Sequence, residues 1–483
     1  MKTKYLDLIE QTYDFPQEEF QLVDDNLFFQ GVDLMSLARR YGSPLKFTYL
    51  PKISENIGRA KQWFAKAMTK YGYKGNYHYA YCTKSSHFQH VLNEALKNQV
   101  HIETSSAYDI DIVEHLKSEG KISSSTFILC NGFKRGQYVQ KMGRLINNGH
   151  DNCIPILDNY EELQLLEKAI DGKFKLGLRI ASEEEPKFEF YTSRLGIGYK
   201  NIVPFYNQSI KGNPRVELKM LHFFINTGIR DTAYYWNELL KCLKVYISLK
   251  KICPTLDSLN IGGGFPIKNS LAFEYDYAYM VDEIVLQIKQ ACEEAQVDVP
   301  DIFTEFGSFT VGESGGAIYE VIHQKQQNDR EKWNMINSSF ITTLPDSWAI
   351  SKRFIMLAVN RWNDEYERVL LGGLTCDSDD YYNSEQHMNA IYLPRYDRNK
   401  PLYIAFFNTG AYQESIGGFG GLQHCLIPQP KHILIDKNSE GHIETRIFNE
   451  EQTAGDFLTI LGFKRHGVSE NGLSNEEQLV LSH

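Results

Sequence analysis

The segment YHYAYCTKSSHFQH, residues 77–90, contains the pattern that decides the fold. Its first six residues are mostly apolar on both faces, as in a strand buried in a parallel sheet. Lys84 follows this run, and a helical pattern, HFQHVLNEALKN, begins at His87. A buried lysine is costly unless its amine is used, and an amine whose pKa is lowered by desolvation can form a Schiff base. A snorkelling or salt-bridged lysine is the alternative interpretation.

Seven further strand-like runs follow as far as residue 306, with amphipathic helical patterns between several of them. The runs are VHIET (100–104), TFILCN (126–131), CIPILD (153–158), KLGLRI (175–180), KMLHFFIN (219–226), SLNIGG (258–263) and DIFTEF (301–306). Eight strands alternating with helices predict an α/β protein with a (β/α)8 TIM barrel over residues 46–315. A doubly wound open sheet is the alternative.

After residue 315 the strand-like runs become denser and helical patterns become scarce. Examples are GGAIYEVIHQK (315–325), RVLLGGLTC (368–376) and PLYIAFFN (401–408). This pattern predicts a C-terminal β domain over residues 316–465, resembling a β-sandwich or β-barrel. The N-terminal segment, residues 1–45, is expected to join it, and residues 466–483 form a polar tail.

The composition excludes several classes of partner. The 483 residues carry a net charge of −10 without a dense basic stretch, which argues against nucleic acid and anionic membranes. No apolar run approaches the roughly 20 residues that span a bilayer, and the first 20 residues are too polar for a secretory signal. We therefore expect a cytoplasmic protein. Its eight cysteines include no CxxC pair, so we expect reduced thiols, mostly in the core, and no zinc.

Two further motifs stand where strands end. LNIGGGFP (259–266) places three glycines after a strand, where backbone N–H groups can bind a phosphate. TEFGS (304–308) places Glu305 at the end of the last barrel strand, where a carboxylate can hold a pyridine nitrogen protonated. Lysine, phosphate loop and carboxylate in one barrel fit pyridoxal phosphate better than a nicotinamide, and no GxGxxG fingerprint follows the first strand.

Several segments of the chain resemble those of a known family. These segments are TKSSHFQHVL (83–92), IETSSAYDI (102–110), LCNGFK (129–134), LPDSWAI (344–350), TCDSD (375–379) and GAYQE (410–414). Together with the glycine loop they resemble the fold-type III, barrel-type pyridoxal-phosphate decarboxylases of basic amino acids, most closely the biosynthetic arginine decarboxylases. The resemblance implies an alanine racemase-like fold, with a barrel and a β domain.

The resemblance also implies roles for individual residues. Lys84 would bind pyridoxal phosphate covalently, and Glu305 would contact the pyridine nitrogen. Cys376 would return a proton to the substrate carbon after CO2 leaves, a task that suits a thiol. Asp377, with Asp379 available beside it, would recognise the substrate's distal cation. The other positions that the resemblance places around the cofactor are Ser106, Arg179, Phe224, Thr227, Gly262, Gly263, Gly264 and Tyr412.

The chain departs from the family pattern at several positions, among them Asn226 in place of a glycine and Thr227 in place of a serine. Phe224 stands where the family has a histidine that stacks on the cofactor ring, and Ser308 stands where it has an arginine. A phenylalanine can still stack through its face. We interpret the nearby His222 as a core or strand residue.

The activity implied by the resemblance is decarboxylation of L-arginine to agmatine and CO2, the entry to polyamine synthesis. It also implies a homodimer, or a higher oligomer, in which Cys376 and Asp377 reach the neighbouring subunit's site, and Mg2+ as an optional ion. Ornithine, lysine, diaminopimelate and carboxynorspermidine stay open as substrates. A racemase would need a second acid/base residue on the opposite ring face, and a non-catalytic carrier usually lacks a β domain.

Overall fold

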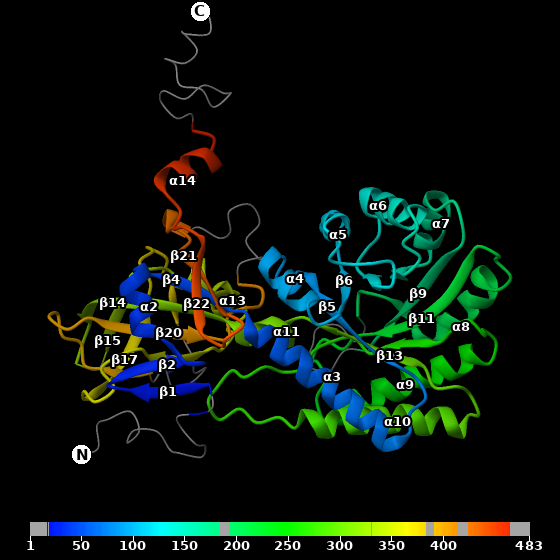
Figure 1. Ribbon diagram of the computed structural model, residues 1–483, viewed down its shortest axis with the longest axis horizontal. Helices are drawn as coiled ribbons and strands as arrows, with labels where there is room; N and C mark the ends of the chain where they lie inside the picture. Colours follow the sequence, from blue (N-terminus) through cyan, green and yellow to red (C-terminus); the bar gives the residue numbers. More distant parts are fainter. Residues whose placement is uncertain are drawn as a thin grey trace, which may run out of the picture. The chain divides into compact units, whose positions relative to one another are not determined.

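The computed structural model describes residue 17 and residues 19–183, 193–329, 331–382, 391–413 and 424–463 (Figure 1). The chain divides into two compact units. The barrel unit comprises Leu50–Lys268 and Phe273–Ser314, and the β unit comprises Met1–Tyr49, Asn269–Ala272 and Gly315–His483. The predicted polar tail, residues 466–483, lies outside the described residues.

A closed barrel of eight parallel strands forms the centre of the barrel unit. The strands are β5 (Tyr77–Cys82), β6 (His101–Thr104), β7 (Ile128–Cys130), β8 (Cys153–Leu157), β9 (Phe174–Ala181), β11 (Val216–Phe223), β12 (Ser258–Asn260) and β13 (Asp301–Phe306). They are hydrogen-bonded in this order, and β13 pairs in parallel with β5, which closes the ring. The short strand β10 (Ile197–Gly198) extends β9. The predicted TIM barrel is confirmed, and the open doubly wound sheet is wrong because the closing pair exists.

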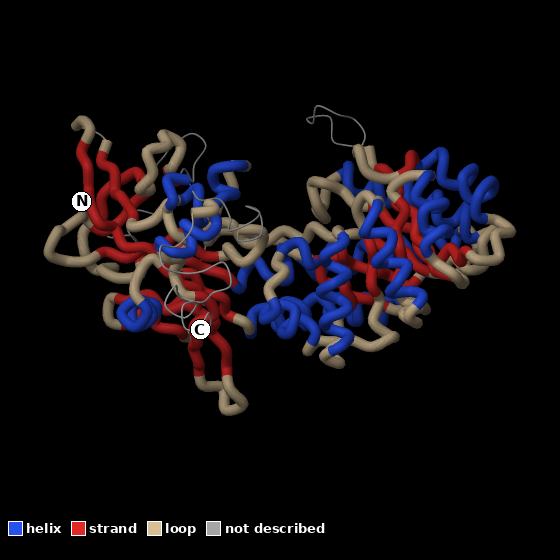
Figure 2. Tube along the Cα trace, turned by 90° about the horizontal axis from the view of Figure 1, so that it is seen from above, coloured by secondary structure: helices blue, strands red, loops and turns tan. Residues whose placement is uncertain are grey.

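Helices surround these strands on the outside of the barrel (Figure 2). They are α3 (Pro51–Tyr71), α4 (Gln89–Leu96), α5 (Ala107–Ser118), α6 (Gly136–Asn147), α7 (Glu161–Ala169), α8 (Tyr199–Phe205), α9 (Ala233–Lys250), α10 (Tyr277–Glu294) and α11 (Ser308–Val311). Their ends follow local chemistry. Helix α3 begins with Pro51, whose missing N–H is not needed there, and ends at Gly72 in the left-handed conformation, φ 60°. Between β5 and α4 lies the short turn η1 (Thr83–Ser85), which carries Lys84.

A chain of hydrogen bonds joins two histidines near the amino ends of the barrel strands. The amide of Phe127 donates to His101 Nδ1 at 3.1 Å, which leaves the proton of a neutral His101 on Nε2. His101 Nε2 lies 3.1 Å from His78 Nδ1, and His78 Nε2 lies 3.0 Å from Asp301. Burial, together with the charges of His78 and Lys61, lowers the pKa of His101 to about 3. His101 is therefore a neutral link in this chain at physiological pH.

The β unit is built on a mixed sheet with the order β18-β17-β15-β14-β4-β21-β22. These strands are β4 (Leu45–Tyr49), β14 (Gly315–Gln326), β15 (Lys332–Ile336), β17 (Tyr366–Gly372), β18 (Tyr381–Tyr382), β21 (Lys431–Lys437) and β22 (Ile443–Asn449). Strand β4 pairs antiparallel with β14 and parallel with β21. A strand from the N-terminal part of the chain thus lies inside the sheet of the C-terminal part.

Smaller elements complete the β unit. Strand β20 (Leu402–Phe407) pairs with β14 and with β16 (Ile355–Ala358), and β19 (Ile391–Pro394) pairs with β17. A separate three-stranded sheet contains β1 (Phe20–Val23), β2 (Asn26–Phe29) and β3 (Val32–Asp33). The helices are α2 (Leu34–Tyr41), α12 (Phe340–Thr343), α13 (Pro345–Ala349) and α14 (Ala454–Ile460). Within the described ranges, no helix is both long and apolar enough to cross a membrane.

Candidate active site

Lys84 contacts a buried carboxylate at the carboxyl ends of the barrel strands, the end where barrel enzymes place their chemistry. Its Nζ lies 3.3 and 3.2 Å from the two oxygens of Glu103, a fully buried residue of β6. The side chain of Lys84 is itself 45% exposed. The prediction that the Lys84 amine is desolvated is therefore wrong. Lys84 lies in η1, beyond the buried strand, and its amine forms an ion pair.

Asn131, directly after β7, links Glu103 to Glu305. Its side-chain Nδ2 donates to Glu103 Oε1 at 3.0 Å and lies 2.9 Å from each oxygen of Glu305. The lysine and the carboxylate that the sequence singled out are thus joined through two further side chains. The network runs from Lys84 through Glu103 and Asn131 to Glu305.

Glu305 is held in its ionised form by its surroundings. Burial by itself raises the pKa of this carboxyl group, but His222, Lys84 and Asn131 together lower it, to about 2. His222 Nε2 lies 3.2 Å from Glu305 Oε2, and Asn260 Nδ2 donates to Oε1 at 2.6 Å. A buried anion at this position can hold a protonated ring nitrogen.

The glycine loop after β12 passes so close to neighbouring backbone that side chains would not fit. A Cβ on Gly263 would lie 2.0 Å from the carbonyl oxygen of Glu305, and one on Gly264, at φ 105°, would lie 2.6 Å from Gly228 Cα. The amide of Gly262 donates to Asn260 Oδ1 at 2.9 Å. For the described residues, the structure assigns no acceptor to the amides of Gly263 and Gly264. Gly262 therefore shapes the loop, and the next two amides are the candidate phosphate donors.

The other predicted barrel residues have differing surroundings. The guanidinium carbon of Arg179, from β9, lies 5.8 Å from the centre of the Phe224 ring, and burial lowers the pKa of Arg179. Ser106 accepts a hydrogen bond from the amide of Asp109, which in turn accepts from the Ser106 amide, so Ser106 caps α5. Thr227 follows β11 and is half-buried. The hydroxyl of Ser106 thus already has a structural use.

Three buried polar atoms in this region have no partner among the described residues: Asn131 Oδ1, Arg179 Nε and His222 Nδ1. Buried polar atoms without hydrogen bonds cost free energy, so they are rare unless a ligand satisfies them. Together with the unpaired glycine amides and the Glu305 anion, they fit a ligand that carries a phosphate and a basic ring nitrogen. Pyridoxal phosphate has both groups.

The remaining predicted residues belong to the β unit. In the loop between β17 and β18, buried Asp380 accepts hydrogen bonds from the amides of Phe340 at 2.8 Å and Thr375 at 3.1 Å. Asp380 thereby fixes the loop that carries Cys376, Asp377 and Asp379. Tyr412 is half-buried, in the left-handed conformation with φ 71°.

Cys376 is exposed, and so is Asp379. Asp377 is half-buried: its Oδ2 lies 3.3 Å from His424 Nε2, and its Oδ1 accepts from the amide of Asp379 at 2.8 Å. Asp377 and Asp379 lie on one loop with Cys376, and the roles that the resemblance gives them stay predictions.

Sequence reasoning assigned no role to four residues that complete the network. Glu103 and Asn131 stood at strand ends, but nothing in their spacing distinguished them from ordinary polar exits. Asn260 lies inside the run SLNIGG, and a polar residue in a buried strand was the signal that could have identified it. His222, interpreted as a core or strand residue, is buried in β11 and also contacts Glu305.

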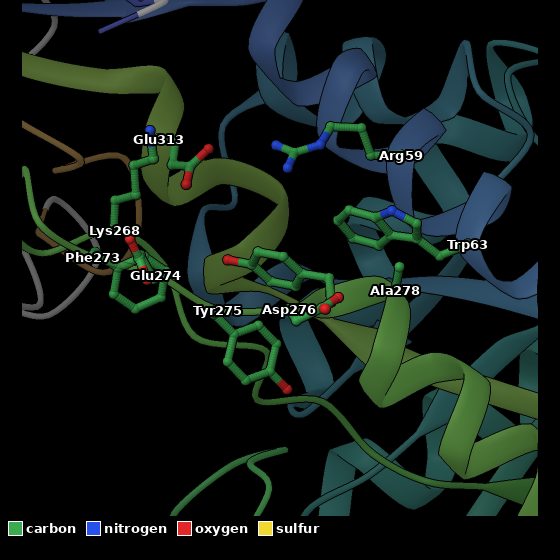
Figure 3. A pocket seen from close by; sticks show the side chains of 10 residues that line it. Arg59, Trp63, Lys268, Phe273, Glu274, Tyr275, Asp276, Ala278 and Glu313 are labelled. Carbon is green, nitrogen blue, oxygen red and sulfur yellow. The ribbon is translucent and has the colours of Figure 1, made fainter. Parts of the chain in front are cut away.

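A separate cavity of about 690 Å³ lies outside the barrel strands, near the N-terminus of α10 (Figure 3). Trp63 and Tyr277 stack there with ring centres 4.8 Å apart, and the Arg59 guanidinium lies 5.1 Å from the Trp63 ring. None of the residues predicted to bind the cofactor lines this cavity. In the described part of the chain, no group of three or more His, Cys, Asp or Glu side chains is placed to hold a metal ion.

Residues 54–312 match the family described as "Pyridoxal-dependent decarboxylase, pyridoxal binding domain". A curated relative, biosynthetic arginine decarboxylase 2 of Synechocystis sp., is 22% identical over 92% of this chain and 87% of its own length. The structure is similar to that of the biosynthetic arginine decarboxylase of Campylobacter jejuni, with a TM-score of 0.79, 20% identity, and coverage of 93% of this chain and 90% of the other. It is also similar to diaminopimelate decarboxylase of M. jannaschii, with a TM-score of 0.77, 17% identity, and coverage of 94% and 99%.

Proposed function

The chain belongs to the pyridoxal-dependent decarboxylase family, and from this premise we propose that it decarboxylates L-arginine to agmatine and CO2, the entry to polyamine synthesis. The observation that carries the proposal is the network from Lys84 to Glu305. It joins a lysine amine to a carboxylate whose pKa is lowered to about 2, at the barrel end where such enzymes work. Such a pair suits a cofactor with an aldehyde and a basic ring nitrogen.

Pyridoxal phosphate supplies an aldehyde that binds amines covalently and a ring that accepts the electrons released with CO2. Lys84 would hold it through the amine, while Glu103 keeps that amine in place at 3.2 Å. Glu305 would face the ring nitrogen, and its pKa of about 2 keeps it anionic at every physiological pH. The amides of Gly263 and Gly264 would donate to the phosphate.

Two residues of the barrel would position the ring. Phe224 presents an aromatic face beside the guanidinium of Arg179, at 5.8 Å, and stands in the place of the family's histidine. His222 would act through Glu305, since it donates to that carboxylate and raises its preference for the charged state. The sequence departure at Phe224, directly after β11, is thus accompanied by a histidine within β11 that contacts Glu305.

Cys376 and Asp377 would complete the reaction from the β unit. The thiol of Cys376 would return a proton to the substrate carbon that loses CO2. Asp377 would pair with the distal cation, since a planar guanidinium favours a carboxylate. By the family resemblance we propose a homodimer in which these two residues serve the neighbouring subunit's site.

A second candidate substrate is diaminopimelate or lysine. The likeness to diaminopimelate decarboxylase of M. jannaschii, at a TM-score of 0.77, favours it because the fold is nearly as similar as that of the arginine enzyme. Its distal group is an ammonium, which one carboxylate can also bind. The substrate's length and distal charge therefore separate the two candidates.

The test is CO2 release by the purified full-length chain after loading with pyridoxal phosphate. L-arginine, L-ornithine, L-lysine, diaminopimelate and carboxynorspermidine are compared by kcat/KM, with Lys84→Ala as the inactive control. We expect arginine to give the highest value. A higher value for another amino acid would refute the substrate, and a cofactor-loaded protein that releases CO2 from none of them would refute the activity.

A further inference from the structure

Two cysteines of the β unit face each other at the surface. The Sγ atoms of Cys376 and Cys425 lie 3.4 Å apart, although 49 residues separate them in the sequence. Both side chains are exposed, whereas the other six cysteines are buried. Cys130 and Cys153 form a comparable close pair, with Sγ atoms 3.7 Å apart, but they lie in the barrel core. Proximity and exposure therefore coincide only at Cys376 and Cys425 among the cysteines.

Cys425 also lies beside a histidine that contacts a carboxylate. His424 Nδ1 lies 3.1 Å from Cys425 Sγ, and His424 Nε2 lies 3.3 Å from Asp377 Oδ2. A carboxylate can only accept, so Asp377 orients the Nε2–H of His424 toward itself and leaves Nδ1 facing the Cys425 thiol, in the position of a base beside a nucleophile. The arrangement favours Cys425 as the attacking sulfur, because His424 Nδ1 is placed to take its proton.

Cys376 is suited to the complementary role. Its hydrogen bond with Cys425 raises the pKa of the Cys376 thiol, and no histidine within hydrogen-bond distance of Cys376 is assigned among the described residues, so Cys376 is the sulfur that attacks second. A disulfide bond is about 2.05 Å long, so the sulfurs would need to approach by about 1.4 Å. Both side chains are exposed, and rotation about their side-chain bonds can supply that movement.

We propose that Cys376 and Cys425 are an oxidative modification site, at which a hydroperoxide converts the two thiols into one intramolecular disulfide. The Cys425 thiolate attacks one peroxide oxygen, the O–O bond breaks, and Cys425 becomes a sulfenic acid while hydroxide leaves. The Cys376 sulfur then attacks the Cys425 sulfur, the S–O bond breaks and water leaves. In sum, two thiols and one H2O2 give one disulfide and two molecules of water.

The modification has a consequence that rests on the proposed function. The Cys376 thiol is the group proposed to return a proton to the substrate carbon, and in the disulfide it has no proton to give. Oxidation would therefore stop turnover, and a dithiol reductant would restore it. The formation of the disulfide itself does not depend on what the enzyme catalyses.

The test begins with peptide mapping of the full-length, cofactor-loaded protein. The protein is treated with H2O2, free thiols are blocked with N-ethylmaleimide, and the digest is analysed without reductant. We expect one cross-linked peptide pair, lighter than its two thiol forms by two hydrogen atoms, that joins Cys376 to Cys425 and disappears with dithiothreitol. Cys130 and Cys153 are the internal control, since burial should keep them unlinked. Alkylation of both Cys376 and Cys425 after peroxide would overturn the proposal.

Cys425→Ser provides the matched variant, because it changes one sulfur to oxygen and leaves Cys376 in place. We expect peroxide to inactivate the wild type in proportion to the cross-link, with recovery in dithiothreitol, and to inactivate the variant at least about 10-fold more slowly relative to its own untreated rate. Equal rates of inactivation would overturn the role of Cys425. A reduced protein that decarboxylates nothing would refute the proposed function alone, since the peptide map would still decide whether the pair forms.

Discussion

Replacing Asn131 by aspartate places a third carboxyl group between Glu103 and Glu305. The Nδ2 that it replaces lies 3.0 Å from Glu103 Oε1 and 2.9 Å from both oxygens of Glu305. Like charges about 4 Å apart repel by about 4 kcal/mol at an effective dielectric constant of about 20, so two such neighbours would cost about 8 kcal/mol. The triad of carboxyl groups should therefore take up one proton near neutral pH, which costs less.

The free energy of that proton uptake sets the size of the effect. With a pKa of about 3.9 in the unfolded chain, the cost is about 1.4 kcal/mol for each pH unit above this value, or about 4 kcal/mol at pH 7 and about 1.5 kcal/mol at pH 5. The pKa of the introduced group is raised by folding. The variant therefore has its full free energy of unfolding below about pH 3.9 and loses part of it as the pH rises.

Urea unfolding of wild type and Asn131→Asp at pH 5, 6 and 7 measures this difference. We expect the deficit of the variant to shrink by about 2.5 kcal/mol from pH 7 to pH 5. Asn131→Ser is the control, because it loses the same hydrogen bonds without adding a charge and should show a deficit independent of pH. A deficit of Asn131→Asp that stays constant across this range would refute the shared position of Asn131 between two anions.

Four other substitutions test separate parts of the molecule. Gly263→Ala should weaken pyridoxal phosphate binding by about 10- to 100-fold, the scale of 1–3 kcal/mol of overpacking, because its Cβ would lie 2.0 Å from a carbonyl oxygen; unchanged affinity in a fluorescence titration would contradict the cradle. Cys376→Ala should leave cofactor affinity unchanged and slow CO2 release by about 100-fold, and near-normal release would assign the proton to another group. Asp377→Ala should raise KM for a cationic substrate with a smaller effect on kcat, and an unchanged KM would make this loop structural. The pKa of His101 is lowered to about 3, so its contribution to the free energy of unfolding is complete above about pH 6.5 and is lost as the pH falls. In urea unfolding, the wild type should therefore lose about 2 kcal/mol more between pH 7 and pH 5 than His101→Gln does. An equal loss in both proteins would contradict the neutral link.

The sequence was sufficient for the barrel because its strands are buried on both faces and leave continuous apolar runs. Strand β5, for example, occupies the same residues, Tyr77–Cys82, as the run that predicted it. The predicted burial of Lys84 was wrong because the run ends two residues earlier, and a sequence pattern does not show how far a side chain reaches into solvent. The turn η1 decides that exposure.

Contacts between residues distant in the sequence could not be predicted in the same way. Asn131 and Glu305 are 174 residues apart, and only the order of strands in the closed barrel brings them together. The same holds for Cys425, which belongs to no motif and becomes notable only beside Cys376. The resemblance supplied residue types at single positions, whereas pairings between them depend on the folded chain.

The position of β4 in its sheet has a consequence for synthesis of the protein. Its two neighbours, β14 and β21, begin at Gly315 and Lys431, so a ribosome must make the whole barrel before Leu45–Tyr49 has either partner. During that interval the apolar residues of β4 have no sheet to join, whereas all eight barrel strands, in a unit almost continuous in sequence, have already been made. The order of translation therefore requires the residues of β4 to stay unpaired in the nascent chain until the C-terminal part of the β unit has been made.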